Sequence, residues 1–569
     1  MSSSYKRQLL GWLSYAFASE VFVVVSLTLF LPICLEQFAR DNGYLRPDYI
    51  RPCMSEAENN GNAYTTELRC AVKIGWAWID TASFSLYVYS MSVALQALTV
   101  ISMSSIADRP TCRKPLLLTF AAIGSFSAML FLPLSSSSPL WILAAVFAIF
   151  ANVGFGASVV AMNAYLPALA SASPEAIQAR VNLEELSTSS DHIRSSEEDA
   201  EREHSPSVRN ESVTVPLLGT SDPLKDDDQR EFNAALSRAT SRISSLGIAS
   251  GYGAGIILLL LALVPVTKMH GSTFSLRLAI GLSGVWWAVF SIPAALWLPR
   301  STAASKHDDE SAAFSPVPVE AANKDWAIRA EIVAAWKRLG VMLRWSQIKR
   351  LQHTFRYLAA WFLLSDGFTT ITSTAVLFGK TTLHMAPSWL VLIGAITPLM
   401  GIASSLVFPY LQRRLGWSNL RIVVLLVLMV SCIPAYGCLG FVPFIKHNLP
   451  FGGLTTPGEM FGLAVYFGFA YGAFQSYARA CYADLIPQGE EARWYGLFSI
   501  TDKSSSFVGP LIVGLIADAT GNIRYSFFFL LFMVWLAVPV LLSVNVEQGR
   551  TDARNYHADG GLSEESSES

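Results

Sequence analysis

The sequence predicts an all-α polytopic membrane protein with about twelve transmembrane helices, arranged as two bundles of six. Of its 569 residues, 52% are hydrophobic and only 15% are charged, whereas soluble domains average about 25% charged residues. Its apolar runs reach the length of roughly 20 residues that a helix needs to cross a bilayer. The net charge of −2 argues against binding to nucleic acid, which needs a concentrated basic surface.

Apolar runs of spanning length define the expected helices. In the first half they cover residues 9–34, 76–106, 116–134, 140–166, 246–266 and 274–298. In the second half they cover residues 355–378, 388–411, 422–445, 460–486, 494–517 and 525–544. Each half therefore makes an even number of crossings and returns the chain to the side from which it started.

The first run contains an acidic residue, Glu20, near its midpoint. A carboxylate at that depth costs on the order of 3 kcal/mol on insertion scales. We therefore expect Glu20 to face a protein interior or a water-filled cavity rather than lipid, with the other helices built around it.

Basic residues near the helix ends predict the orientation. Clusters of Lys and Arg occur at positions 6–7, 109–114 and 413–421, whereas the short loops on the opposite side carry mostly single cations. Positive charges collect on the cytosolic side of a membrane, so both termini are expected in the cytosol. The loop at residues 35–75 weakens this asymmetry because it holds several arginines, although its acids roughly match them.

Three polar stretches divide the chain. Residues 171–240 are rich in Ser, Asp and Glu and predict a disordered cytosolic loop. Residues 301–353 link the two halves through an amphipathic helix that suits either an anionic leaflet or docking on the bundle. Residues 547–569 are expected to form a disordered cytosolic tail. The membrane segments are then residues 1–170 (helices one to four), 241–300 (helices five and six) and 354–546 (the second bundle).

Two of the seven cysteines, Cys53 and Cys70, lie in the polar loop after the first helix. If that loop is non-cytosolic, a disulfide between them and a pair of free thiols are both open. The sequence shows no metal-spaced His/Cys cluster, phosphate loop or nucleophile elbow, so we expect no metal, no cofactor and no enzyme activity. Glycines at positions 247–255 predict close packing of the fifth helix.

Equivalent helix endings suggest a doubled unit. The second helix ends in Ser-Ser-Ile-Ala-Asp-Arg (residues 104–109) and the eighth in Leu-Gln-Arg-Arg (411–414). The fourth ends in Asn-Ala-Tyr-Leu-Pro (163–167) and the tenth in Ala-Asp-Leu-Ile-Pro (483–487). This pattern resembles the major facilitator superfamily, in which two six-helix bundles rock about a site at the membrane midplane.

That resemblance implies a gate on the cytosolic side. The superfamily signature Gly-x-x-x-Asp-Arg-x-Gly-Arg-Arg is matched only in part, because Ser104 replaces the glycine and an extra residue precedes Arg113. Asp502 and Lys503 are adjacent on one helix, so we expect them to point to different sides and either to have separate partners or to belong to the cytosolic interface. The implied gating residues are Asp108, Arg109, Arg113, Asp484, Asp502 and Lys503.

A narrower resemblance lies in the first helix and in the last three. The first helix contains Gly-Trp-Leu-Ser-Tyr-Ala-Phe-Ala-Ser-Glu-Val-Phe (11–22), and later blocks read Leu-Ile-Pro-x-Gly-Glu-Glu-Ala (485–492), Ile-Thr-Asp-Lys-x-Ser-Ser (500–506) and Ala-Asp-Ala-Thr-Gly-Asn (517–522). These blocks closely resemble the fungal autophagy-related vacuolar effluxer family. The resemblance implies a multi-pass protein of the vacuole membrane that exports neutral amino acids, such as leucine, isoleucine and tyrosine, to the cytosol after autophagic degradation.

In a facilitator fold the first, fourth, seventh and tenth helices line the cavity, and this chain has polar residues on each. Arg479 is expected to clamp the carboxylate of an amino acid, because its guanidinium stays charged and binds carboxylates bidentately. Glu20 or Asp366 would hold the ammonium group. Alternatively, Arg479 pairs with Glu20, Asp484 or Asp502 and only holds the bundles together. The predicted substrate-binding residues are Tyr15, Glu20, Asn152, Asp366, Gln475 and Arg479.

The coupling of transport is open at this stage. A buried carboxyl at Glu20 or Asp366 is a candidate proton carrier between an acidic lumen and a neutral cytosol, and facilitated diffusion without protons is the alternative. Expected partners are neutral amino acids, the lipid bilayer and, if transport is coupled, protons. Two further functions stay open: a facilitator for another small solute, and a sensor or scaffold that transports nothing.

Overall fold

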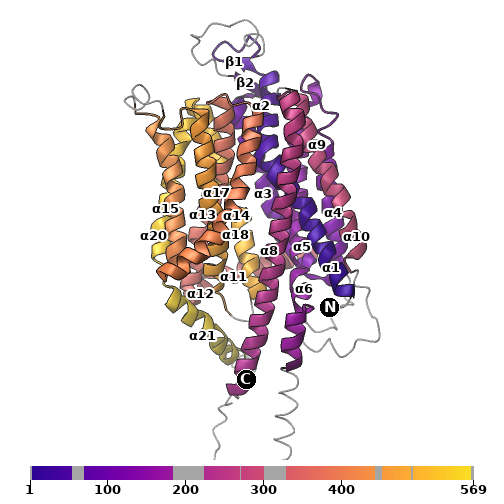
Figure 1. Ribbon diagram of the computed structural model, residues 1–569, viewed down its shortest axis with the longest axis vertical. Helices are drawn as coiled ribbons and strands as arrows, with labels where there is room; N and C mark the ends of the chain where they lie inside the picture. The colour runs from indigo at the N-terminus through magenta and orange to yellow at the C-terminus, as the bar shows by residue number, and fades with distance from the viewer. Residues whose placement is uncertain are drawn as a thin grey trace, which may run out of the picture.

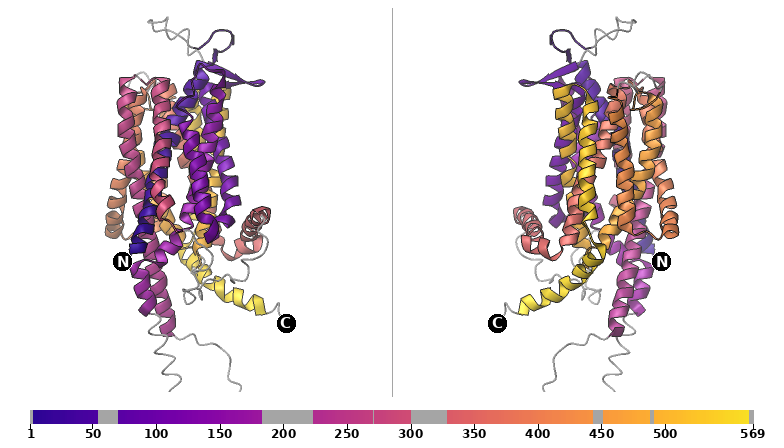
Figure 2. Two further views of the ribbon diagram at one scale, coloured as in Figure 1. Left: turned by 90° about the vertical axis from the view of Figure 1, so that its right-hand side faces the viewer. Right: turned by 90° about the vertical axis from the view of Figure 1, so that its left-hand side faces the viewer.

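The computed structural model describes residues 3–53, 70–182, 223–269, 271–299, 328–442, 451–487 and 491–565. Its long helices run side by side along the longest axis of the molecule (Figure 1). Both chain termini lie at one end of these helices, and a small β-sheet lies at the other (Figures 1 and 2). We call these the terminal end and the sheet end.

The first half of the chain forms one set of helices that pack on each other. The first spanning helix packs on α8, α9 and α10, and α5 packs between α3 and α4. The elements are α1 (Ser3–Val21), η1 (Phe22–Phe30), α2 (Leu31–Asp41), α3 (Thr81–Asp108), α4 (Pro110–Met129), η2 (Pro139–Ile142), α5 (Leu143–Asn163), α6 (Leu166–Ser171), α8 (Pro223–Lys268), α9 (Thr273–Phe290) and α10 (Ile292–Trp297).

The first spanning helix changes its hydrogen-bond pattern just after Glu20. It is continuous over Ser4–Asp41, but η1 (Phe22–Phe30) is a π-helix between two α-helical parts. Three consecutive valines follow the first residue of this segment, and β-branched side chains crowd an α-helical turn. Wider π-helical turns occur often at functional sites. The helix is thus irregular beside its acidic residue.

Three short strands replace the expected start of the second helix. The sheet has the order β1 (Tyr44–Leu45), β2 (Cys70–Ile74) and β3 (Ala77–Asp80), with antiparallel neighbours. Gly75 takes a positive φ of 61° at the turn between β2 and β3. The prediction that a helix begins at residue 76 was therefore wrong. Instead, Asp80 caps α3 by accepting a hydrogen bond from the Ala82 N–H.

The second half repeats the arrangement with a second set of helices. Here α13 packs on α18, α19 and α20, while α17 packs on α14 and α15. The two halves meet where α3 packs on α18 and α19 and where α8 packs on α14. The elements are α13 (Gln352–Thr381), α14 (Pro387–Leu415), α15 (Asn419–Leu439), α17 (Pro457–Ala483), α18 (Glu491–Ser505), α19 (Val508–Thr520), η5 (Ile523–Tyr525) and α20 (Ser526–Leu542).

Nine helices in the described residues are long and apolar enough to cross a membrane. Among the others, α4, α17 and the broken pair α18–α19 pack with these nine. The fold is therefore all-α and polytopic as predicted, while the number twelve stays a prediction. The break in the expected helix 494–517 separates α18 from α19 and matters for the site described below.

The polar stretches are more helical than the sequence suggests. Residues 174–182 are helical, and α8 begins at Pro223 rather than near residue 246. The tail forms the helix α21 (Val546–Glu565), which leaves the bundle at the terminal end (Figure 2). Disorder over 171–240 and after 547 was therefore wrong for these parts, and residues 183–222 lie outside the described residues. The linker holds α11 (Ile328–Met342) and α12 (Trp345–Arg350).

Candidate functional site

Opposite charges from the two halves interact electrostatically inside the bundle. Glu20 of α1 lies in the electrostatic field of two cations of the second half, Lys503 of α18 and Arg479 of α17. Glu20 is half-buried and Arg479 is exposed. Within the described residues, neither side chain makes a hydrogen bond or an ion pair with the protein.

Two tyrosines and a glutamine complete this cluster. Tyr471 lies on α17, one turn before Gln475, whose side-chain N–H donates to the Tyr471 hydroxyl over 2.7 Å. Tyr252 of α8 lies in the fields of Glu20, Arg479 and Tyr471. We name Glu20, Tyr252, Tyr471, Gln475, Arg479 and Lys503 the central cluster. It joins α1 and α8 of one half to α17 and α18 of the other.

Because Gly251 has no side chain, the Glu20 side chain has room beside it. A Cβ atom at Gly251 would lie 2.5 Å from the Cγ of Glu20, which is closer than real contacts allow. Gly247 and Gly255, one turn away on either side, meet Trp12 and Val24 in the same way, whereas Gly253 has no atom within 4 Å of its added Cβ. The glycine run therefore serves the close packing of α8 on the first helix, as predicted.

The carboxylate of Asp366 is held by hydrogen bonds within the second half. It is 2% exposed and accepts hydrogen bonds from the Gly509 N–H at 2.9 and 2.8 Å and from the Thr370 hydroxyl at 3.3 Å. Gly509 is in the first turn of α19, whose N–H groups have no partner within the helix. Asp366 thus anchors the break between α18 and α19, and its prediction as an ammonium ligand is not supported by this geometry.

Asn152 and Tyr15 also lie away from the central cluster. The Asn152 amide is 1% exposed, donates to the Ser92 hydroxyl and accepts from Gln96, so its hydrogen bonds join α5 to α3. Tyr15 is fully buried near Trp287 within the first half. It stands five residues before Glu20, which turns it by about 140° around the helix at 3.6 residues per turn. The structure brings neither residue to the substrate position predicted for it.

Asp502 and Lys503 do not have separate partners. The Lys503 Nζ lies 3.1 Å from a carboxylate oxygen of Asp502, because a long lysine side chain can curl back over its neighbour. Asp502 also accepts from the Ser365 hydroxyl of α13. The expectation that the adjacent pair splits was wrong, and Lys503 reaches the central cluster instead of a gate at the terminal end.

Two of the residues with an implied gating role bind the linker and the tail. Arg109 forms an ion pair with Glu331 of α11, and Arg113 donates to the Ala107 carbonyl over 3.0 Å. Asp484 forms an ion pair with Arg550 of α21, with 3.0 Å between their N and O atoms. The side chain of Asp108 lies outside the described residues. Within the described residues, the ion pairs of Arg109 and Asp484 thus go to the linker and the tail rather than to the opposite half.

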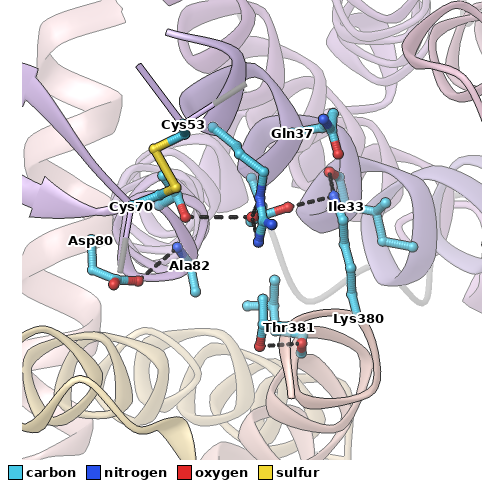
Figure 3. Close-up of polar contacts among 12 residues, drawn as sticks. Ile33, Gln37, Cys53, Cys70, Asp80, Ala82, Lys380 and Thr381 are labelled. Atoms are coloured by element: carbon cyan, nitrogen blue, oxygen red, sulfur yellow. Dashed lines mark hydrogen bonds and ion pairs between the residues drawn. A yellow bond between two sulfur atoms is a disulfide. The ribbon is translucent and has the colours of Figure 1, made fainter. Parts of the chain in front are cut away.

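The halves are instead joined at the sheet end. Lys380, in the last turn of α13, forms an ion pair with Glu36 of α2, which is fully buried. Figure 3 shows Lys380 reaching toward Ile33, whose carbonyl accepts from its Nζ over 2.8 Å. Arg40 forms a second ion pair with Glu36 at 2.8 Å. Glu36 therefore ties the first helix of one half to the first helix of the other.

A second ion pair joins the halves beside the sheet. Arg46 binds Asp518 of α19 at 2.9 Å, and the Asp80 N–H donates to the same carboxylate over 3.2 Å. Burial raises the pKa of the Asp80 carboxyl, which the Ala82 N–H and Arg46 partly oppose and Asp518 reinforces. Nearby, Cys53 and Cys70 are joined by a disulfide (Figure 3).

Sequence reasoning missed several of these residues. Glu36, Lys380, Arg46 and Asp518 were not predicted as a gate, and Tyr252 was not predicted in the site. One signal was present: Glu36 and Lys380 follow the first helix of each half, where two equivalent helices would meet in a doubled unit. Tyr252 follows Gly251 directly in the glycine run.

Comparisons with known proteins identify the family. Residues 4–554 match the family described as "Vacuole effluxer Atg22 like". The chain is 40% identical over 574 residues to Autophagy-related protein 22 of Cryptococcus neoformans var. neoformans serotype D, with 95% of each chain covered. It belongs to the Atg22-like vacuole effluxer family. Autophagy-related protein 22-1 of Aspergillus fumigatus is 38% identical over 575 residues, with 96% of this chain and 91% of that protein covered.

Solved structures show the fold of this Atg22-like chain. It matches a mutant of the nucleoside transporter NupG with a TM-score of 0.50 at 10% identity, covering 95% of this chain and 100% of that one. A mutant of the peptide transporter POT, in complex with sulfate, matches with a TM-score of 0.50 at 10% identity, covering 94% of each chain. These matches show that the Atg22-like chain shares the fold of these two transporters. Its family, described as a vacuole effluxer, makes it a multi-pass membrane transporter of the vacuole rather than an enzyme.

Proposed function

We propose that this transporter exports neutral amino acids, such as leucine, isoleucine and tyrosine, from the vacuole lumen to the cytosol by alternating access. The observation that carries the proposal is the pair of opposite charges in the central cluster. Glu20 of the first half and Arg479 of the second interact electrostatically but form no ion pair within the described residues. Because an amino acid carries one charge of each sign, it fits between them.

In this proposal each group of the cluster has one task. Arg479 binds the substrate carboxylate through two parallel hydrogen bonds, and Glu20 binds the ammonium group. Tyr252 and Tyr471 offer ring surface to an apolar side chain. Gln475 orients the Tyr471 hydroxyl. Binding then draws together two helices that belong to opposite halves, which is the movement that alternating access needs.

The orientation follows from two features of the ends. The sheet end carries the disulfide Cys53–Cys70, and disulfides persist in non-cytosolic compartments. The basic clusters lie at the terminal end, and positive residues favour the cytosol. We therefore infer that the sheet end faces the lumen and both termini face the cytosol. Because ion pairs join the halves at the sheet end, we interpret the structure as a state with the lumenal entrance shut.

We infer that Glu20 is also the proton carrier if transport is coupled. Of the two carboxyls considered, Asp366 is held by the Gly509 N–H and serves α19. Glu20 has no protein partner within the described residues and is half-buried. A proton taken up by Glu20 from the acidic lumen would leave for the cytosol together with the amino acid, so that it moves down its own gradient. Each pH unit of gradient then supplies about 1.4 kcal/mol per proton.

The test is uptake of radiolabelled leucine by counterflow in liposomes that contain the purified protein. We expect Arg479→Ala and Glu20→Gln to lose most of the flux, while Arg414→Ala, an exposed arginine at the terminal end, keeps it. A pH gradient should accelerate the wild type and leave the residual flux of Glu20→Gln unchanged. Full leucine flux in Arg479→Ala would refute the proposed site, and equal wild-type rates with and without the gradient would refute coupling.

A further inference from the structure

We propose that an apolar groove at the terminal end of the second half binds one acyl chain of an anionic phospholipid, whose phosphate lies against the cations of α12. The groove has a volume of about 450 Å³ and is lined by α13, α18 and the end of the linker helix α11. Its walls include Leu343, Phe355, Ala359, Phe362 and Leu497. Its side chains are therefore almost entirely hydrocarbon.

The one hydroxyl among the groove's lining residues is already used. Thr501 of α18 lines the groove, and its hydroxyl donates to the Leu497 carbonyl over 2.8 Å. An extended peptide placed here would leave its own backbone N–H and C=O groups without partners in a hydrocarbon environment, at a large cost. An acyl chain has no such groups, so lipid is the occupant that the lining favours.

The groove opens at the depth where a lipid headgroup begins. Its α13 walls lie in the first turns of a membrane span that starts at Gln352. The helix α12 ends at Arg350, immediately before that span. Only Leu351 separates α12 from the span, so Arg350 lies close in the chain to the groove residue Phe355. A single phospholipid can thus reach both the cations and the apolar walls.

The positive charge of residues 344–350 favours a lipid with a negatively charged headgroup. Residues 344–350 read Arg-Trp-Ser-Gln-Ile-Lys-Arg and contain no acid. Arg344, Lys349 and Arg350 are exposed and have no ion-pair partner within the described residues. Trp345 is 68% exposed, as is typical of a tryptophan at a membrane interface, and Lys349 lies 5.9 Å from its ring centre. Anionic lipids should therefore be preferred over zwitterionic ones.

The site would connect lipid to the movement of the halves. Leu343, at the end of the linker helix, forms one wall of the groove against the second half. The same linker helix is tied to the first half, since Glu331 pairs with Arg109 and Trp336 donates to the Ser102 hydroxyl. A bound acyl chain would hold the linker helix α11 in place between the two halves. In the orientation proposed above, the lipid comes from the cytosolic leaflet, but binding at the terminal end does not depend on the identity of the substrate.

Native mass spectrometry of the full chain in detergent tests the proposal. We add phosphatidylserine or phosphatidylcholine and count the lipid molecules retained. The wild type should retain phosphatidylserine about fivefold better than phosphatidylcholine, or more. Ala359→Trp, which fills the groove from an exposed position, should lose this adduct, while Leu428→Trp on the exposed face of α15 should keep it. Lys349→Glu with Arg350→Glu should abolish the preference, and Arg413→Glu with Arg414→Glu should not.

Two results would overturn the proposal. One is an unchanged phosphatidylserine adduct in both Ala359→Trp and the double charge variant. The other is a thermal stabilisation by glycerophosphoserine, which has the headgroup but no acyl chains, that equals the stabilisation by phosphatidylserine. Thermal unfolding without added lipid shows whether each variant is folded, so a loss of the adduct in a folded variant supports the proposal. None of these measurements uses transport, so they separate this proposal from that of amino-acid export.

Discussion

Lys380 of the second half and Glu36 of the first form an ion pair at the sheet end, and the carboxylate of Glu36 is fully buried. The pair joins the first spanning helices of the two halves. A buried ion pair is weak support for overall stability, but removing one partner leaves a buried charge without compensation. The Glu36–Lys380 pair is therefore suited to keep the two halves together at the sheet end, because opening this end must expose both charges to water at once.

Lys380→Ala should destabilise the closed sheet end by about 3 kcal/mol, at the low end of the range for a broken buried pair, because Arg40 still binds Glu36. The readout is labelling of a cysteine introduced at Ser90, whose hydroxyl donates to the Phe507 carbonyl across the halves. We expect faster labelling by a membrane-impermeant maleimide added at the sheet end.

The control for this experiment is Lys268→Ala, which removes an exposed lysine from the last turn of α8. Its labelling rate should match that of the wild type. The charge swap of Glu36→Lys with Lys380→Glu should restore part of the protection. Equal labelling in Lys380→Ala and Lys268→Ala would contradict a gating role for the pair.

Gly251→Ala should impair the central cluster because the new methyl group would meet the Glu20 side chain at 2.5 Å. Such overpacking typically costs about 1 to 3 kcal/mol. Thermal unfolding should show a lower Tm, and leucine flux should fall, because Glu20 must leave its position. Gly253→Ala is the matched control, since its added Cβ has no neighbour within 4 Å. A Tm equal to that of Gly253→Ala would contradict this prediction, because it would show that the Glu20 side chain moves aside without loss of stability.

The sequence predicts the fold far better than the site. Long apolar runs report burial in lipid directly, so the helices α3, α5 and α13 begin or end within a few residues of their predicted positions. Charge alone cannot show which partner a residue meets. Asp366 and Glu20 look alike in sequence, yet Asp366 binds the Gly509 N–H at a helix break, and no periodicity predicts that break. Glu20 and Arg479 of opposite halves do interact electrostatically, but their role as substrate ligands stays a prediction.

Asp366→Ala should loosen the start of α19. The carboxylate accepts from the Gly509 N–H and from Thr370 while almost fully buried. Loss of a cap or of a hydrogen bond to a charged group costs about 1 to 3 kcal/mol. Asp366→Asn keeps one acceptor oxygen and should lose less. Thermal unfolding of the two variants checks this order, and a Tm for Asp366→Ala equal to that of the wild type would contradict the anchoring role.

The pKa of Asp80 predicts a pH dependence of the sheet end. Because burial raises this pKa above that of the free carboxyl, the folded form binds its proton more tightly than the unfolded form. The resulting contribution to stability is fully present below the pKa of the unfolded form and is lost as the pH rises through the raised pKa of the folded form. Asp80→Asn mimics the protonated carboxyl at every pH. Its Tm should therefore equal that of the wild type in acid and exceed it increasingly as the pH rises, whereas a constant difference would contradict the shift.

Arg479→Lys tests how the proposed carboxylate site works. Lysine keeps the positive charge but cannot form the two parallel hydrogen bonds of a guanidinium. One hydrogen bond to a charged group contributes about 1.5 to 3 kcal/mol, and about 1.4 kcal/mol corresponds to a tenfold change in affinity. The KM for leucine should therefore rise about tenfold or more, while Arg414→Lys at an exposed position leaves it unchanged. If Arg479 only holds the bundles together through its charge, lysine replaces it and KM stays as in the wild type.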